Sequence, residues 1–316
     1  MVQAASTAAT REALGPTLIK LVREGVDIAV VDADLGVSTT AAVFGKEYPD
    51  RFFSVGVQEQ NMVGVAAGIA ANGHVAFASS FAVFLPGHCF DQVRMAVAQP
   101  HLNVKLVASH GGIVTGEDGA SAEALEDLAL MLSLPNFNVI VPSDLPEAEQ
   151  AIEVAARTEG PFYIRTVRPK IPILHDDSYR FQLGKAEMMR PGSDVTVMAN
   201  GVMTKAALDA ADLLAAEGID CRVLNVASLR PLAEEAITAA ARETGAIVTA
   251  EDHSIFGGLG SAVAQVTART HPVPIAFVGM TRYGTSGVWN ELLQYFELTP
   301  ERIAREARTL VAAKRG

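Results

Sequence analysis

The segment 52–71, FFSVGVQEQNMVGVAAGIAA, constrains the fold more than any other part of this chain. Its first residues are aromatic or β-branched, which predicts the end of a buried strand. The rest is rich in glycine and alanine, which predicts a helix packed closely against another element. Glu59 is the single acidic residue and lies where the strand gives way to the helix. A carboxyl group there must be paired, cap the helix or take part in chemistry, because an unpaired buried charge is costly.

Strand-like and helix-like patterns follow one another in turn along the chain, which predicts strands separated by helices. In the first half we expect strands at 28–35, 74–80, 104–110, 137–143 and 161–167, with helices at 10–24, 91–99, 122–132 and 145–157. Such alternation predicts βαβ units and a mostly parallel sheet with helices on both faces. A second α/β pattern follows a proline-containing and charged stretch, and in it the run CRVLNVAS (221–228) predicts one strand. We therefore expect two α/β domains, at 1–170 and 185–316, joined by a linker at 171–184.

Composition excludes several classes of function. The chain has 316 residues, enough for two cores, and no apolar run long enough to span a bilayer. Its net charge of −11 argues against nucleic acid as a partner, because binding to phosphate backbones needs a basic face. The first residues, MVQAASTAATREALG, show no basic and apolar signal pattern, and the two cysteines, Cys89 and Cys221, lie far apart. We expect a cytoplasmic protein without a membrane partner.

Four of the predicted strand ends carry polar or aromatic groups. They are Asp34 with Ser38, Glu59, Phe81 with Phe84, and His110 with the GEDG sequence at 116–119. Each has an ordinary explanation. Asp34 could cap a helix, Glu59 could be the third residue of a helix capped by Gly56, the phenylalanines could be core, and GEDG could be a turn. Parallel strands, however, bring their carboxyl ends to one edge, where ligands bind.

The order and spacing of these motifs resemble the C-terminal half of transketolases. The resemblance rests on ATRE (9–12), DADLGVS (32–38), the Glu59 segment, SSFAVF (79–84), SHGGIVTGEDGAS (109–121), SLPNFNVIVPSD (133–144), EDHSIFGGLGSAV (251–263) and RYGTSG (282–287). It covers nearly the whole chain. It implies a pyrimidine-binding domain for thiamine diphosphate, followed by the family's C-terminal domain. It also implies transfer of a two-carbon ketol unit between sugar phosphates.

The resemblance also implies roles for single residues around the cofactor. Glu59 would hydrogen-bond the pyrimidine ring of thiamine diphosphate and favour the tautomer that takes the proton from the thiazolium carbon. Phe81 and Phe84 would form an aromatic wall around that ring. Asp34 would be an acid near the cofactor.

Further residues match the family's substrate side. His110 would face the substrate, and Asp118 would contact a substrate hydroxyl. Arg11 and Ser38 would hold the substrate phosphate. A second arginine would be Arg165 or Arg168, and the sequence leaves this choice open. A bidentate arginine suits a phosphate dianion.

The chain departs from the family pattern in two places. After GEDG, Ala122 stands where the family usually has a histidine, and Glu123 follows it, which puts the usual sugar-phosphate specificity in question. The chain also has no Gly-Asp-Gly, the start of the family's magnesium–diphosphate motif. The resemblance therefore implies the smaller subunit of a two-chain transketolase, in an α2β2 assembly whose larger subunit binds Mg2+ and the diphosphate. No metal ligands are expected in this chain.

Three other functions fit parts of the pattern. A β subunit of a 2-oxo acid dehydrogenase has the same two domains, and a deoxyxylulose phosphate synthase shares the cofactor. GEDG together with His110 favours transketolase over both. A non-catalytic scaffold subunit would explain Ala122, but such a subunit has no need of Glu59, Phe81 and Asp118.

Overall fold

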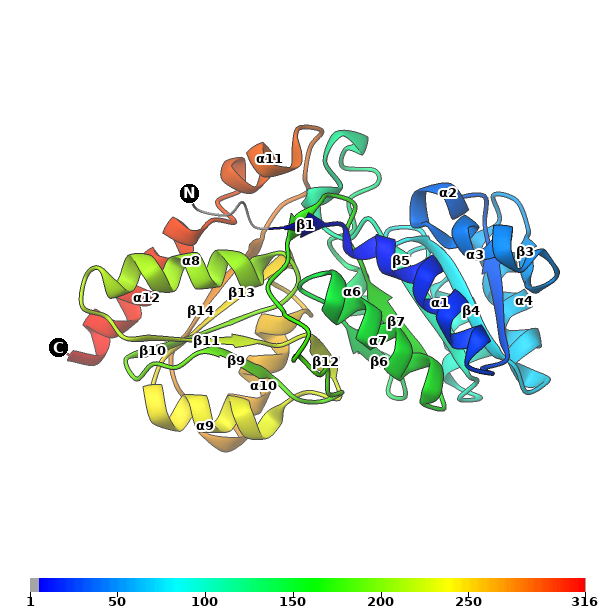
Figure 1. Cartoon of the computed structure of the whole chain (residues 1–316). Helices are drawn as coiled ribbons and strands as arrows, with labels where there is room; N and C mark the ends of the chain where they lie inside the picture. Colours follow the sequence, from blue (N-terminus) through cyan, green and yellow to red (C-terminus); the bar gives the residue numbers. More distant parts are fainter. Residues whose placement is uncertain (1–5, 316) are drawn as a thin grey trace.

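The structure of this chain, a computed structural model, describes residues 6–315 and contains two α/β domains that lie side by side (Figure 1). Each domain is built around its own mostly parallel sheet. A small antiparallel pair, β1 (Thr7–Ala8) with β8 (Ile171–Pro172), ties the start of the chain to the end of the first domain. The predicted fold class is therefore confirmed.

The sheet of the first domain has its strands in the order β12-β6-β7-β5-β4-β2-β3. Their bounds are β2 Ile28–Asp32, β3 Phe52–Ser54, β4 Val75–Phe81, β5 Val104–Ser109, β6 Asn138–Ile140, β7 Phe162–Arg165 and β12 Ser228–Arg230. All neighbours pair in parallel except β12, which joins β6 in the antiparallel sense. The parallel strands consequently end along one edge of the sheet.

Helices cover both faces of this sheet. One face carries α1 (Leu14–Arg23), α3 (Ala41–Glu47) and α7 (Leu145–Arg157), and the other carries α4 (Glu59–Ala71), the π-helix η3 (Val93–Ala98) and α6 (Asp127–Leu132). The α7 helix begins where predicted, because the Asp144 side chain accepts a hydrogen bond from the Glu147 N–H (3.0 Å). The shorter elements are η1 Thr10–Ala13, α2 Gly36–Thr39, η2 Pro49–Arg51, α5 Phe90–Gln92 and η4 Ile113–Asp118.

The second domain has a five-stranded sheet in the order β14-β13-β10-β11-β9. Its elements are β9 Glu187–Arg190, β10 Val195–Ala199, α8 Met203–Ala215, β11 Cys221–Asn225, α9 Glu234–Thr244, β13 Ile247–Ser254, α10 Leu259–Thr270, β14 Ile275–Met280, α11 Trp289–Tyr295 and α12 Pro300–Arg315. β9 is antiparallel to β11, and the other pairs are parallel. In Figure 1, α8 and α12 lie on one side of this sheet and α9 and α10 on the other.

The segment around Glu59 differs from its prediction in burial. β3 is the last strand of its sheet, so only one side of it is paired, and Phe53 and Val57 are 43% and 73% exposed. The prediction that this strand is buried is therefore wrong. Along α4 the alanines pack into the core, whereas Gly64 and Gly68 face outward with no atom within 4 Å of the place a Cβ would take.

Several predicted elements are shorter in the structure, and for two of them the reason is clear. The run predicted as one strand at 221–228 is split, because β11 ends at Asn225 and the chain crosses to the other sheet, where β12 begins at Ser228. The helix predicted at 122–132 begins only at Asp127. Residues 122–126 form a turn packed under the second domain, and this tertiary contact outweighs their helix propensity.

The two domains share a hydrophobic core. One cluster of buried side chains contains Met62 of α4 and Val139 of β6 together with Ile237 of α9 and Leu259 of α10. The apolar cluster thus runs without interruption from the first domain into the second. The relative position of the domains is fixed by apolar burial, which favours a single arrangement.

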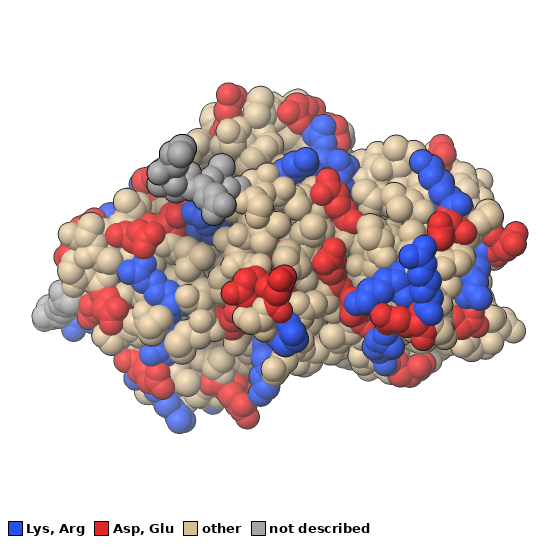
Figure 2. All heavy atoms as spheres, in the orientation of Figure 1, with Lys and Arg blue, Asp and Glu red and all other residues tan. Residues whose placement is uncertain are grey.

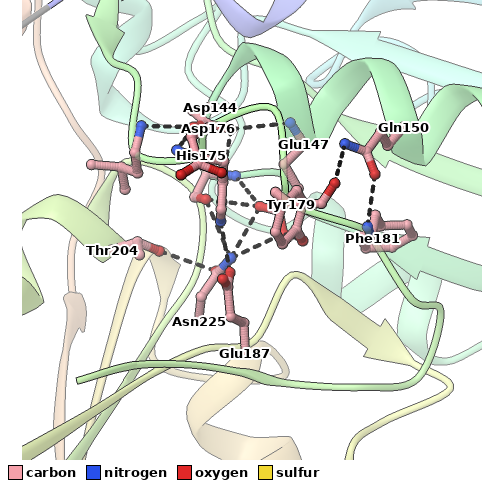
Figure 3. Close-up of polar contacts among 12 residues, drawn as sticks. Asp144, Glu147, Gln150, His175, Asp176, Tyr179, Phe181, Glu187, Thr204 and Asn225 are labelled. Carbon is pink, nitrogen blue, oxygen red and sulfur yellow. Dashed lines mark hydrogen bonds and ion pairs between the residues drawn. The ribbon is translucent and has the colours of Figure 1, made fainter. Parts of the chain in front are cut away.

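A buried polar network also joins the domains, and Figure 3 shows it in close-up. His175, from the predicted linker, lies 2.9 Å from Asp144 through Nδ1 and 2.7 Å from Glu187 through Nε2. Asn225 donates hydrogen bonds to both carboxyl oxygens of Glu147 (3.0 and 3.1 Å). Burial alone lowers the pKa of His175, but its hydrogen bonds to Asp144 and Glu187 outweigh this and raise the pKa to about 10. The imidazole is therefore a charged clamp at neutral pH.

On the face shown in Figure 2, lysine and arginine side chains are interspersed with aspartate and glutamate. Among the helices of residues 6–315, none is long and apolar enough to cross a bilayer.

Candidate active site

The predicted site residues of the first domain gather at the carboxyl edge of its sheet. Asp34 follows β2, Phe81 ends β4, His110 follows β5 and Arg168 follows β7. These strands are parallel, so their ends meet at this edge, as the alternation of strands and helices predicted.

Glu59 is the first residue of α4 and is almost completely buried, with 7% of its side chain exposed. Its carboxylate lies at the positive end of the helix dipole, which favours a negative charge. The residue before the helix is Gln58, not Gly56, and no side chain caps the helix. The capping interpretation of Glu59 is therefore not what the structure shows. Its Oε2 instead lies 3.1 Å from Nε2 of His88, a residue that the sequence analysis missed.

Four aromatic rings form a continuous stack that ends at Glu59. The His110 and Phe81 rings are 3.7 Å apart between centroids, Phe81 and Phe84 are 5.8 Å apart with nearly parallel planes (9°), and Phe84 and His88 are 5.9 Å apart. Phe81 is buried and Phe84 half-buried. The two phenylalanines thus present flat apolar surface between a buried carboxyl and a histidine, which suits a planar aromatic ring.

His110 is held in an unusual conformation at the end of β5. Its backbone is left-handed (φ 61°), a strained conformation that is concentrated at functional sites. The ring is buried and its Nδ1 is bonded to Ser109 Oγ. Burial, and then the charges of Arg11 and Arg168, lower the pKa of His110 to about 3. The imidazole is therefore neutral at physiological pH.

Two arginines lie beside His110. Arg11 donates to the backbone carbonyl of Ser38 (2.7 Å), and its half-buried guanidinium has a pKa lowered by burial and then by the charge of Arg168. Arg168 donates to Glu117 (2.6 Å) and lies 4.0 Å from Asp118. Two positive charges that repel each other across a partly buried space form a binding site for an anion.

Arg165, the other candidate for the second arginine, is not part of this group. Only 3% of its side chain is exposed, and its Nε forms an ion pair with Asp127 (3.0 Å). Its Nη2 donates to the carbonyls of Ala124 and Asp252 (2.9 Å each). Arg165 thus joins the two domains from inside the core.

Asp32, the last residue of β2, and Asp34, which follows the strand, take different positions. Asp34 is exposed and left-handed (φ 64°). Asp32 is buried and accepts hydrogen bonds from the backbone N–H groups of Asp34, Leu35 and Gly36, although burial still raises its pKa. Asp32 is therefore the one that organises the turn before α2, and Asp34 is left at the open edge.

Ala122 and Glu123 lie beneath the GEDG turn. Both are buried, so the Glu123 side chain does not point into solvent. Neither carboxyl oxygen of Glu123 has a hydrogen-bond partner among the described residues. The carboxyl touches the backbone of Gly284, where a Cβ would lie 1.8 Å from Oε2. Burial and then the charge of Asp252 raise the pKa of Glu123 to about 7.

Residues 6–315 contain no group of three or more His, Cys, Asp or Glu side chains that could hold a metal ion. The site described here therefore offers a carboxyl and an aromatic wall for a planar ring, and two arginines for an anion.

Comparison with known proteins places this architecture in a family. The family models for the transketolase pyrimidine-binding domain and the transketolase C-terminal domain match residues 6–173 and 184–303. A Methanocaldococcus jannaschii protein, whose name describes it as a transketolase C-terminal section, is 42% identical over 299 residues, which are 93% of this chain and 94% of that protein. This chain therefore belongs to the transketolase family, as its motifs predicted.

Two further relatives are informative. A Clostridium protein named 6-deoxy-6-sulfo-D-fructose transketolase subunit SqwH is 39% identical over 298 residues, covering 94% of this chain and 92% of its own length. The solved structure of a split-gene transketolase, described as an inactive β4 tetramer, superposes with a TM-score of 0.89 at 43% identity and covers 97% of this chain and 99% of that one. These relatives are likewise sections or subunits.

Proposed function

We propose that this chain is the smaller subunit of a two-chain transketolase, which transfers a two-carbon ketol unit between sugar substrates with thiamine diphosphate as cofactor. The observation that carries the proposal is the ring stack with Glu59 at one end and His110, beside two arginines, at the other. One end suits the cofactor's pyrimidine, and the other suits the anionic end of a substrate.

The cofactor half of the site is built from Glu59, Phe81, Phe84 and Asp34. When bound, the cofactor supplies a thiazolium carbon that becomes a nucleophile. The Glu59 carboxyl would hydrogen-bond the pyrimidine, which fits its burial at a helix start beside flat aromatic surface. The faces of Phe81 and Phe84 would exclude water from the ring, and the exposed Asp34 would lie toward the rest of the cofactor.

The substrate half is built from His110, Asp118, Arg11, Arg168 and Ser38. A neutral His110 can donate one hydrogen bond or accept one without a net charge, which suits a sugar hydroxyl or carbonyl. Asp118, exposed beside Arg168, would accept from a hydroxyl. Arg11 and Arg168 would bind the terminal anion.

The anion can be a phosphate or a sulfonate. The Clostridium relative is named for a sulfonated sugar. Both groups present three oxygens to a donor pair, so the two arginines suit either. We therefore propose a ketose with a terminal anionic group as donor.

A larger subunit would complete the site. The described residues hold no metal-binding group, and the relatives with the same two domains are named as a section, a subunit and a split-gene product. Val37 and Val57 are 88% and 73% exposed beside the site, and Gly64 and Gly68 face outward on α4. We infer that this surface contacts the larger subunit. An α2β2 assembly in the cytoplasm, with Mg2+ and diphosphate held by the larger subunit, fits these features.

The test of this function is Glu59→Gln in the assembled enzyme. Glutamine keeps the shape and loses the acid, so hydrogen–deuterium exchange at the thiazolium carbon should slow by ~10²–10⁴-fold. Glu235→Gln, on a side chain that is 94% exposed in the second domain, is the control and should exchange normally. Exchange at the wild-type rate in Glu59→Gln would refute the proposed role.

A further inference from the structure

We propose that His88 is a positioning residue that relays protons between Glu59 and solvent. The inference rests on the proposed function, because only a Glu59 that takes part in proton transfer needs such a route. His88 Nε2 lies 3.1 Å from Glu59 Oε2. The carboxyl is 7% exposed and the imidazole 49% exposed, so the imidazole bridges the buried acid and water.

Contacts on two sides hold His88 in this place. Its ring stacks on Phe84 (5.9 Å, 30°), in the turn that follows β4. Its backbone carbonyl accepts a hydrogen bond from the Gln60 side chain (2.8 Å), and Gln60 is the residue after Glu59. The segment that carries the imidazole is therefore fixed to the beginning of the helix that carries the carboxyl.

The other titratable groups nearby cannot take this role. Cys89 is buried, and burial and then the charge of Glu59 raise its pKa to about 12, so it remains a thiol. His110 stands at the far end of the stack, beyond the rings of Phe81 and Phe84. Among the described residues, His88 is the titratable side chain in hydrogen-bond contact with Glu59.

The relay moves one proton and needs no other reagent. The protonated carboxyl of Glu59 gives its proton to Nε2 of a neutral His88, and the resulting imidazolium loses the Nδ1 proton to water. The reverse sequence returns a proton to the carboxylate. Imidazole suits this exchange because its ordinary pKa is near neutral.

The experiment compares His88→Ala and His88→Gln in the assembled enzyme, again by exchange at the thiazolium carbon. Glutamine can hold the Glu59 oxygen but cannot relay a proton, so both variants should slow exchange by ~10–100-fold, below the full cost of losing an acid–base group. Added imidazole should restore His88→Ala. His74→Gln is the matched control, because His74 is 48% exposed and bonded to Asp27 (2.7 Å) outside the site.

A second readout uses the lone chain without cofactor. In 15N NMR spectra, the Nε2 signal of His88 should move in Glu59→Gln and stay unchanged in His74→Gln. Wild-type exchange in His88→Gln, failure of imidazole to rescue His88→Ala, or an Nε2 signal insensitive to Glu59→Gln would each overturn the relay. Wild-type exchange in Glu59→Gln would instead overturn the proposed function, so the two failures are distinguishable.

Discussion

At the scale of single residues, the carboxyl group of Glu123 stands out because it is buried near the site without a hydrogen bond from any of the described residues. It touches the loop of the second domain at Gly284. A protonated carboxyl is tolerated there far better than a carboxylate, because an unpaired buried charge is costly. The pKa of about 7 follows from burial first and from Asp252 second.

Glu123 should therefore make stability depend on pH in a defined window. The folded pKa is raised above the ordinary 4.5, so the stabilising effect of protonation is complete below about pH 4.5 and lost as pH rises through about 7. Glu123→Gln should be more stable than wild type by about 1–3 kcal/mol at pH 8, and the difference should shrink toward pH 5. Urea unfolding at both pH values measures this, and Glu235→Gln is the control. A difference that does not change with pH would mean that Glu123 is already paired.

Ala122 should limit the use of ordinary ketose phosphates. A histidine at this place could donate to a substrate oxygen, and one such hydrogen bond is worth ~0.5–1.5 kcal/mol, or up to about tenfold in binding. We expect weak activity with xylulose 5-phosphate and ribose 5-phosphate, and recovery in Ala122→His. The specificity constants of the assembled forms decide this, with Ala120→His, on an exposed residue of the same turn, as control. Full wild-type activity on these sugars would make Ala122 neutral variation.

At the scale of elements, His175 connects the predicted linker to both domains. It pairs with Asp144 of the first domain and with Glu187 at the start of β9. Because its pKa is raised to about 10, its stabilisation is complete below the ordinary 6.5 and is lost as pH rises through about 10. His175→Gln should cost about 3 kcal/mol at pH 7, since it leaves a buried carboxylate without its charged partner.

Urea unfolding at pH 7 and pH 10.5 tests this connection. The difference in unfolding free energy between wild type and His175→Gln should be smaller at the higher pH. The control His74→Gln should change the unfolding free energy little, because the His74 side chain is half exposed. An equal difference in unfolding free energy at both pH values would contradict the pairing of a charged His175 with the two carboxylates.

The elements also show how far the sequence alone could lead. Strand and helix alternation predicted α7 to the residue and placed Glu59, Phe81 and His110 at one edge. The crossing of β12 to the other sheet was not predictable, because the alternation of apolar residues does not say which sheet a strand joins. His88 was missed because a lone histidine in a turn carries no periodic signal. The burial of Arg165, which sets it apart from Arg168, could not be predicted, because it results from the packing of the two domains.

At the scale of the whole molecule, a shared core fixes the two domains as one unit, while the edge that carries the site stays open and partly apolar. Such a rigid unit with part of a site at its edge agrees with our proposal that a second chain completes the site. Among residues 6–315, no group of three or more His, Cys, Asp or Glu side chains could hold a metal ion.

The most direct test of this account is calorimetric titration of thiamine diphosphate, with Mg2+, into the lone chain and into the chain assembled with its larger subunit. The diphosphate half should add at least two charge-assisted hydrogen bonds of ~1.5–3 kcal/mol each, so the lone chain should bind at least ~100-fold more weakly. Its weak binding should not depend on Mg2+, whereas the assembly should bind tightly only with Mg2+. Tight, Mg2+-dependent binding by the lone chain would contradict the two-chain account.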